Sequence, residues 1–469
     1  MICARIIQVM RMDPSIKVKV IIAQIQALYN YTISYRKAWL GKNKAIEQIY
    51  GNWEESYNQF PRWLLVMQTF APRTIIKMET IPTYNEHGFI NGMTIFHRLF
   101  WAYVPCISAF KFCKPIVQVD GTWLYGKYNG TLLVAVAQDG NDNIILIAYA
   151  LVEDRHKSIK SAYNNLNNGW QHPPSKHVFC VRHIEQNFAR EFKDNALKNK
   201  VISMGYSINE STYRYYRREI GIVNPEALKW LDNIPRQDWI QAFDGGSRWG
   251  QMTTNLVESM NAILKEPHNL PITALVQSTY YKTGTLFSTM AKQHASILAS
   301  GQIYTEKCMT FMKSEIRKSN SHRVDCFDRS NHTFMVHETV VPKEGRPIGH
   351  FSINLPNKWC DCGKYQAKHM PCSHVIAACS SIKYDYWSLI SEVYKVETVL
   401  KVYSEAFQPI PNEGYWPQYE GEVASPGCDL QLGLKSRAIC LTMSPPPTPF
   451  TDINKTKETW KIAIRVVHG

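Results

Sequence analysis

The sequence predicts an α/β protein with a helical N-terminal region, a small antiparallel sheet, a second helical region and a compact metal-binding module. Three observations indicate this class. Apolar residues recur at helical spacing near the N-terminus, three β-branched runs lie between residues 116 and 154, and three cysteines and a histidine cluster at 360–374. The length of 469 residues leaves room for two or three domains, each with a core of its own.

The N-terminal region, residues 1–75, is predicted to be a helical lead-in. One helix face is marked by apolar residues at helical spacing, namely Ile22, Ile25, Leu28 and Tyr31. A second run of helical character follows Gly51. We therefore expect at least two helices before the first strand.

The β-branched runs at 116–120, 131–139 and 144–154 predict three strands. The connecting segments 121–130 and 140–143 carry Gly and Asn, which indicates tight turns. Strands that follow one another through tight turns pair antiparallel, so we expect a meander.

The second half of the chain is predicted to be mostly helical from about 155 to 320, and residues 177–180 can form a short strand. Residues 335–341 and 350–355 form the two strands of a predicted hairpin. After Trp416 the periodicity is lost, and the Pro-rich segment 441–450 has the composition of a linker or a disordered segment.

The sharpest chemical signal is a C-x-C…C-x-H pattern formed by Cys360, Cys362, Cys372 and His374. Three thiolates and one imidazole satisfy the preference of Zn²⁺ for four tetrahedral soft or borderline ligands. His374 opens an apolar run that predicts a helix carrying the last two ligands on its first turn. Spacing and residue order match the SWIM zinc finger. The alternative is two incidental cysteine pairs in a reducing compartment.

Composition points to an ordered protein with a polyanionic partner. Apolar residues make up 45 % of the chain and aromatic residues 12 %, and no apolar run reaches membrane-spanning length, so we expect no membrane association. The N-terminus lacks the order of a signal peptide, and twelve cysteines suit a cytosolic or nuclear protein with reduced thiols. The net charge of +14 makes nucleic acid the leading partner class.

Four further segments, taken in order, resemble plant Mutator-like element transposases: residues 37–64, 119–153, 177–193 and 245–266. The resemblance covers roughly residues 20 to 420, and the zinc finger falls where these transposases carry one. It implies an RNase H-like fold that begins with the three-stranded meander. It also implies DNA transposition in the nucleus, with strand cleavage and transfer.

The resemblance further implies that an acidic triad holds two divalent metal ions, carried here by Asp120, Asp154 and Glu258. Two hard cations such as Mg²⁺, about 4 Å apart, would flank the attacking and leaving oxygens of a phosphodiester. Each acid also has an ordinary interpretation. Asp120 can end a strand, Asp154 can cap a helix, and Glu258 can lie on a solvated helix face.

The order of elements departs from that family after the third strand. An RNase H-like core continues with a crossover helix and a fourth strand, and both are missing between Glu153 and Asp154. Strand three is then displaced from strand one by two strand spacings, about 9–10 Å. We therefore expect impaired catalysis, unless Glu153, Asp139 or Asp142 substitutes for the misplaced acid.

With the resemblance included, the predicted divisions are a helical lead-in (1–75), an RNase H-like core with a helical insertion (76–300), a helix and hairpin linker (301–345), a SWIM-type zinc finger (346–385) and a partly disordered C-terminal extension (386–469).

Cys180 and His183 form a further pair one helical turn apart. Their spacing places both on one helix face, where they could bind a metal if Cys113 or His177 joined them. The alternative is a buried thiol beside a histidine that bonds to the backbone. The resemblance implies a structural role for the pair.

Three functions follow from these observations. The first is a transposase-derived, zinc-binding nuclear protein that binds DNA without cleaving it. The second is an active Mg²⁺-dependent transposase. The third is an interaction module whose SWIM finger recruits a protein partner.

Overall fold

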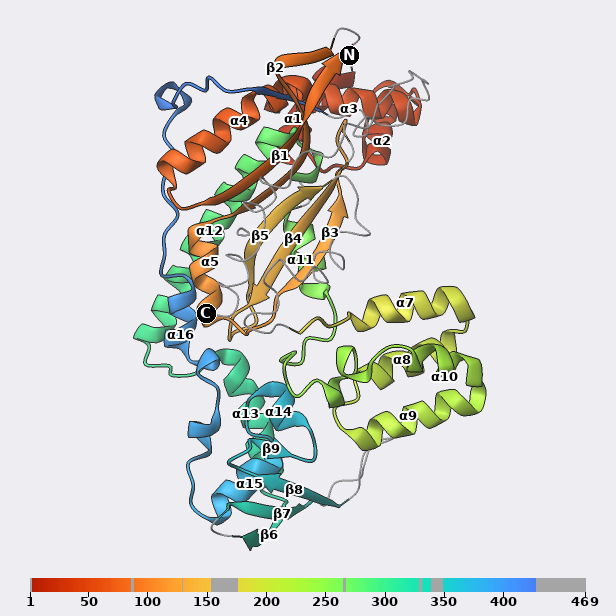
Figure 1. Cartoon of the computed structure of the whole chain (residues 1–469), viewed down its shortest axis with the longest axis vertical. Helices are drawn as coiled ribbons and strands as arrows, with labels where there is room; N and C mark the ends of the chain where they lie inside the picture. Colours follow the sequence, from red (N-terminus) through yellow and green to blue (C-terminus); the bar gives the residue numbers. More distant parts are fainter. Residues whose placement is uncertain are drawn as a thin grey trace.

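The computed structural model describes residues 2–85, 88–128, 130–152, 176–264, 267–328, 331–338 and 349–426 (Figure 1). Glu153, Asp154 and the Pro-rich segment 441–450 lie outside these residues. The described chain is a mixture of helices and two mostly antiparallel sheets.

The N-terminal region is helical, as predicted, and its helices are α1 (Ile2–Met12), α2 (Val18–Tyr29), α3 (Tyr35–Tyr50) and α4 (Trp53–Phe70). Local capping fixes two of the starts. The Ser34 hydroxyl accepts from the backbone N–H of Lys37, and the Asn52 side chain accepts from the N–H groups of Glu54 and Glu55. The two glutamates also place negative charge at the positive end of α4.

The main sheet has the strand order β1-β2-β5-β4-β3, with β10 pairing parallel to β2. Its strands are β1 (Ile75–Asn85), β2 (Gly88–Ala102), β3 (Gln118–Trp123), β4 (Thr131–Gln138), β5 (Ile144–Val152) and β10 (Val423–Ser425). The meander β3–β4–β5 is confirmed, with both pairs antiparallel. The long β1–β2 hairpin was not predicted.

One detail of the strand prediction is wrong. The first strand does not end at Asp120 but continues to Trp123, because Gly121, Thr122 and Trp123 still pair with β4. After Trp416, where the sequence has no periodicity, the short strand β10 adds to the sheet beside β2, and the Trp416 ring packs on Trp63 at 5.4 Å between centroids.

One face of the sheet is covered by the long helix α12 (Ile272–Ala299), which runs alongside the strands in Figure 1. Its threonines bond to aromatic side chains of the sheet. The Trp101 indole donates to Thr279 at 3.3 Å, and the Tyr149 hydroxyl lies 2.8 Å from that of Thr283. The remaining helices around this core are α5 (Val104–Ala109), α11 (Asn255–Ile263) and α16 (Val396–Val402).

A separate group of helices projects to the right in Figure 1: α7 (Val181–Phe192), α8 (Asn195–Gly205), α9 (Glu210–Val223) and α10 (Pro225–Asp232). Asp194, Asn209 and Asn224 cap the last three. The group has its own buried cluster around Phe188 and Trp239. The strand expected at 177–180 does not form, because these residues lead directly into α7 as extended chain without a strand partner among the described residues.

The C-terminal lobe, defined here as the described residues of 306–394, lies at the bottom of Figure 1. It contains α13 (Glu306–Ser319), a sheet of β6 (Arg323–Asp328), β7 (Thr333–His337), β8 (His350–Asn354) and β9 (Trp359–Cys360), and the helices α14 (Lys364–Lys368) and α15 (Ser373–Ser381). The β7–β8 hairpin is confirmed, in antiparallel register.

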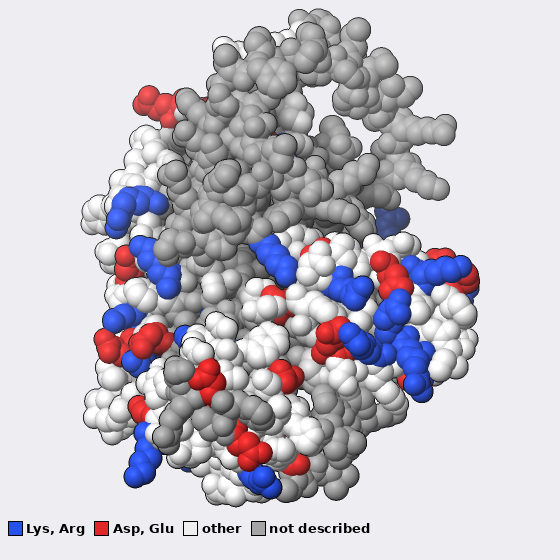
Figure 2. Space-filling model, turned by 60° about the horizontal axis from the view of Figure 1, so that its bottom comes forward, with Lys and Arg blue, Asp and Glu red and all other residues white. Residues whose placement is uncertain are grey.

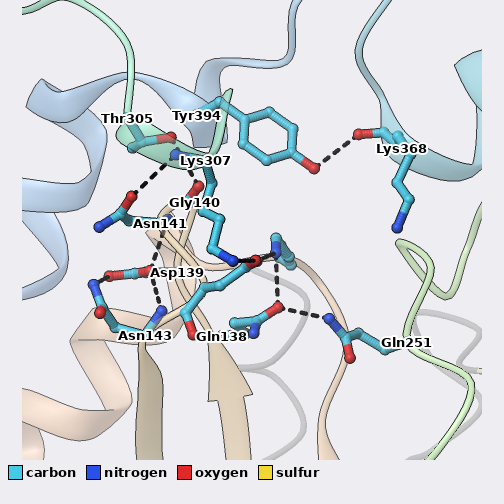
Figure 3. Close-up of polar contacts among 12 residues, drawn as sticks. Gln138, Asp139, Gly140, Asn141, Asn143, Gln251, Thr305, Lys307, Lys368 and Tyr394 are labelled. Carbon is cyan, nitrogen blue, oxygen red and sulfur yellow. Dashed lines mark hydrogen bonds and ion pairs between the residues drawn. The ribbon is translucent and has the colours of Figure 1, made fainter. Parts of the chain in front are cut away.

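The β4–β5 turn joins the main sheet to this lobe (Figure 3). The buried Asp139 carboxylate accepts from the N–H groups of Asn141 and Asn143 and from the Tyr403 hydroxyl. Thr305, the N-cap of α13 at the edge of the lobe, donates from its hydroxyl to the Gly140 carbonyl at 3.0 Å. The lobe is therefore attached to the main sheet through a polar, hydrogen-bonded turn.

Among the described residues, no helix has the length and apolar character needed to cross a membrane.

Candidate metal centre

The four residues of the C-x-C…C-x-H pattern come from two neighbouring elements. Cys360 ends β9, and Cys362 follows in the turn before α14. Cys372 is the N-cap of α15 and His374 lies in its first turn, as the sequence predicted. The β8–β9 pairing and the start of α15 thus bring two distant cysteine-bearing segments together.

Gly363 is required for the first of these turns. Its φ of +77° lies in the left-handed region, and a Cβ there would meet the carbonyl oxygen of Ile208 at 1.9 Å. The Gln366 side chain holds the same turn, because its oxygen accepts from the Cys360 N–H at 3.2 Å while its nitrogen donates to the Cys360 carbonyl at 2.9 Å. The backbone at Cys360 is therefore held by the Gln366 side chain, and Gly363 permits the turn that follows Cys362.

The donor atoms converge on one point. The Sγ atoms of Cys360 and Cys362 are 3.4 Å apart, and Nδ1 of His374 lies 3.6 Å from Sγ of Cys360 and 3.9 Å from Sγ of Cys372. All four donor atoms lie within 4.8 Å of one another. Around a tetrahedral zinc with Zn–S bonds of about 2.3 Å, donor atoms are separated by about 3.5–3.8 Å. The cluster is consistent with zinc binding.

Burial determines what the donor atoms of this pocket need once the thiols are deprotonated. All four side chains are buried, and Cys360, Cys372 and His374 are 0 % exposed. Burial raises the pKa of the Cys360 and Cys372 thiols well above the usual range, while hydrogen bonds from these two thiols lower the pKa of Cys362. Three thiolates can therefore coexist here only with a positive charge among them, which Zn²⁺ supplies. A disulfide does not account for the cysteine pair, because 3.4 Å is far longer than the S–S bond of about 2.05 Å.

The helix α13 supports the centre from outside. The Glu315 side chain is almost fully buried, and it accepts from the backbone N–H of Ser373 at 3.0 Å. It also pairs with Lys318 and Lys364. Burial opposes the charge of Glu315, but the two lysines and the Ser373 N–H outweigh that effect and lower its pKa. Spacing in the sequence gave no signal for this residue.

Comparison with known proteins gives one match. Residues 342–383 match the family model of the SWIM zinc finger, so the chain contains a SWIM zinc finger built on the Cys/His cluster described above. No curated protein and no solved structure matches the chain.

The acids predicted for catalysis are only partly described. Asp120 is the third residue of β3, where its carboxylate accepts from the N–H of Gly121 at 2.8 Å and from the Thr254 hydroxyl at 3.5 Å. Thr254 directly precedes α11, which carries Glu258 and packs on β3. Asp154 lies outside the described residues. Asp120 and the helix of Glu258 are thus neighbours, and the triad stays a prediction.

Of the three acids considered as substitutes, Glu153 lies outside the described residues, and Asp139 and Asp142 already have partners at the β4–β5 turn. Asp139 accepts the hydrogen bonds of the turn described above. Asp142 forms ion pairs with Lys114 and Lys307. Asp120 pairs with Val134, four residues before the end of β4, so the turn lies roughly 13 Å along the sheet from Asp120. Neither acid is placed to complete a site at Asp120.

Cys180 and His183 lie together at the start of α7, where Cys180 is the N-cap. Thr254 donates to the Cys180 sulfur from its backbone N–H at 3.3 Å and from its hydroxyl at 3.7 Å. Burial raises the pKa of Cys180, but hydrogen bonds from His183 and Thr254 outweigh it and lower the pKa to about 7. Within the described residues, neither Cys113 nor His177 joins them in a group of three metal donors.

Proposed function

We propose that this chain is a transposase-derived, zinc-stabilised nuclear protein that binds DNA without cleaving it. The observation that carries the DNA-binding part is the distribution of charge. Residues 1–75 contain ten Lys or Arg and four Asp or Glu, the largest share of the net charge of +14. Such an excess favours a polyanion and raises its rate of association.

The basic residues of the N-terminal region stand beside exposed aromatic side chains. Tyr29, Tyr31 and Tyr35 are 42 %, 59 % and 60 % exposed, and Arg36 and Lys37 are exposed in the first turn of α3. Cations are disfavoured at the positive end of a helix unless an anion compensates them. Tyrosines interleaved with cations also form the kind of surface on which bases stack above a neutralised backbone. We therefore propose the α2–α3 corner, residues 29–37, as the DNA contact.

The zinc finger is not the proposed reader of DNA. Every residue of α15 from Ser373 to Cys379 is buried, so this helix has no free face to insert into a groove. The described segment 349–426 is also slightly acidic, with six lysines, no arginine and eight Asp or Glu. Its role in this proposal is to hold the C-terminal lobe together.

The proposal that catalysis is impaired rests on the meander. Asp120 pairs with Val134, and Val134 pairs with Tyr149 of β5. The end of β5 at Val152 is three residues beyond that row and two strand spacings away, a separation of roughly 14 Å from Asp120. Two-metal chemistry needs its carboxylates around ions about 4 Å apart. The described end of β5 is therefore far from Asp120 compared with the spacing of a two-metal site.

The test of DNA binding is a fluorescence anisotropy titration of duplex DNA at several salt concentrations. A double variant R36A/K37A should reduce the log–log salt slope by about 2, because each lost phosphate contact contributes roughly 0.9. The matched control is R214A/K229A, which removes two exposed cations that already pair with Glu210 and Glu226. Equal slopes for both double variants would contradict the proposed contact, and no binding at low salt would overturn DNA binding itself.

A strand-nicking assay with Mg²⁺ or Mn²⁺ tests the catalytic part. We expect no nicking by the wild-type chain and no change in D120N. Metal-dependent nicking that D120N abolishes would instead support the active transposase.

One observation favours the protein-interaction module as a second candidate. On the face shown in Figure 2, Lys and Arg are interspersed with Asp and Glu over the helices α7–α10 and do not form one basic patch. Several of these cations are in ion pairs, among them Lys198 with Glu185 and Lys200 with Glu219. In the finger, Trp359 is 48 % exposed. This function would be supported if the wild-type chain bound no DNA and the W359A variant lost a protein partner that the wild type binds.

A further inference from the structure

His374 faces two different groups with its two ring nitrogens. Its Nδ1 points into the cysteine cluster, 3.6 Å from Sγ of Cys360. Its Nε2 points the opposite way and lies 3.5 Å from Oε2 of Glu338. The distance to Glu338 is longer than that of a well-formed hydrogen bond, and the Glu338 carboxylate lies beside the imidazole together with His322.

 The geometry is that of a ring held between the cluster and a carboxylate.

The surroundings of His374 restrict its ring to this orientation. The His374 and Glu338 side chains are 1 % and 8 % exposed. Phe351 stacks on one side of the imidazole at 4.2 Å and 22°, and His322 stacks at 5.0 Å and 18°. His322, Glu338 and His374 also bring one donor atom each within 4.8 Å of one another. The carboxylate thus lies next to two imidazoles in a confined place.

Backbone contacts hold Glu338 at this position. It directly follows β7, and its N–H donates to the carbonyl of Gly349 at 2.8 Å, next to the start of β8. The β7–β8 pairing therefore fixes the backbone of Glu338 relative to Phe351, which lies on β8. Only the side-chain torsions of Glu338 remain to be ordered when the metal binds.

A neutral imidazole that gives the lone pair of Nδ1 to a metal carries its proton on Nε2. A carboxylate that accepts this N–H selects the tautomer, fixes the ring plane and makes Nδ1 a better donor. The same contact also offsets part of the unfavourable burial of the Glu338 charge. The orientation of the ring therefore suits both roles, with Nδ1 facing the metal site and Nε2 facing the Glu338 carboxylate.

We propose that Glu338 is a positioning residue of the zinc centre, which orients His374 through Nε2 while Nδ1 faces the metal. This inference rests on the zinc site assigned to Cys360, Cys362, Cys372 and His374. The family match begins at residue 342, so Glu338 lies outside it. A second cation held by His322, Glu338 and His374 is the competing interpretation, and it would require His374 to give up its ring proton.

The test uses the full-length chain and measures zinc affinity by competition with a chromophoric chelator at constant pH. E338A should weaken zinc binding by about 10- to 100-fold, and E338Q should lose less because its carbonyl oxygen still accepts a hydrogen bond. The matched control is E392Q, since the Glu392 side chain is 74 % exposed and belongs to the same lobe. The absorption bands of the Co²⁺-substituted protein should shift in both Glu338 variants and stay unchanged in the control.

The outcomes distinguish failure of the zinc site from failure of the proposed role of Glu338. A wild-type chain that binds no zinc would overturn the zinc site itself. A wild-type chain that binds one zinc, with unchanged affinity and Co²⁺ spectrum in E338Q and E338A, would overturn the role of Glu338 alone. Binding of two metal ions per chain, reduced to one in E338A, would overturn it in favour of the second cation. If E338A does not fold, E338Q decides by the same two measurements.

Discussion

Replacing Gly140 by alanine tests how firmly the main sheet holds the C-terminal lobe. A Cβ at this position would lie 1.8 Å from the carbonyl oxygen of Val393 and 2.6 Å from its carbonyl carbon. Both are backbone atoms, so no side-chain rotation relieves the overlap. Carbon–oxygen contacts need about 3.3 Å or more, so one of the two segments must move by roughly 1.5 Å.

The displacement would affect the contacts that surround Gly140 in Figure 3. The Thr305 hydroxyl donates to the Gly140 carbonyl, and Lys307 and Lys114 both pair with Asp142. Overpacking of a well-packed site costs about 1–3 kcal/mol. If the cost falls on the docked state alone, the lobe opens on the order of 5- to 150-fold more often.

Hydrogen exchange measured by mass spectrometry reports this opening segment by segment. In G140A, exchange should accelerate in peptides that cover residues 139–143 and 391–396, and not in α12. The control is G414A, because a Cβ at Gly414 would meet its nearest atom at an ordinary 3.6 Å. Unchanged exchange on both sides of the junction would refute the reasoning, and so would acceleration in the turn alone.

Two further predictions concern titratable groups. Cys180, with its pKa lowered to about 7, should react with iodoacetamide at a rate that levels off above about pH 7. Burial raises the pKa of Cys308 to about 12, so this control thiol should react slowly. Peptide mass spectrometry after a brief pulse measures both rates, and a Cys180 rate that still rises steeply above pH 9 would contradict the assignment. Burial opposes the charged form of Asp142, but Lys114 and Lys307 outweigh this effect and lower the pKa of Asp142 below 3.8. The ion pairs should therefore stabilise the fold above pH 4, and this stabilisation should be lost as the pH falls through the folded-state pKa. Urea unfolding should therefore show a difference between wild type and D142N at pH 6 that shrinks towards pH 3, and a constant difference would contradict the ion pairs.

The parts of the fold that the sequence predicted are those with a local signal. The helices near the N-terminus follow from the recurrence of apolar residues at helical spacing. The meander follows from β-branched runs separated by Gly and Asn. The zinc ligands are recognisable because four residue types at fixed spacing are much more selective than any pair. In each case the signal comes from residues that are close together in the sequence.

The parts that sequence reasoning missed depend on contacts between distant segments. The β1–β2 hairpin has an irregular burial pattern, because only the second half of β2 faces the core. β10 has three residues and becomes a strand only by pairing with β2. Glu315 and Glu338 precede the ligand pattern by many residues, and only α13 and the β7–β8 hairpin bring them to the centre. No spacing rule connects such residues to a metal site.

The way the chain enters and leaves the C-terminal lobe determines what zinc loss should do. The entering and leaving segments lie side by side, because Thr305 N–H donates to the Tyr394 carbonyl and Val396 N–H donates to the Ile303 carbonyl, both at 2.9 Å. The helix before the lobe, α12, and the helix after it, α16, both belong to the main core and pack on each other. The lobe is therefore an insertion with joined ends, and it can unfold without separating α12 from α16.

Removal of zinc should accordingly unfold the lobe and leave the main core intact. Binding of a structural zinc contributes about 10–16 kcal/mol in small finger modules, more than the whole stability of many domains, so the lobe should not persist without it. In C372S, or in the wild type treated with a strong chelator, hydrogen exchange should become fast in α15 and in β7–β8 and stay slow in α12 and β4. C379S serves as the control, because Cys379 is buried in the same helix but lies outside the cluster of donor atoms. Loss of protection throughout the chain would show that the lobe is not a separable insertion, and retained protection in α15 would show that zinc does not hold it.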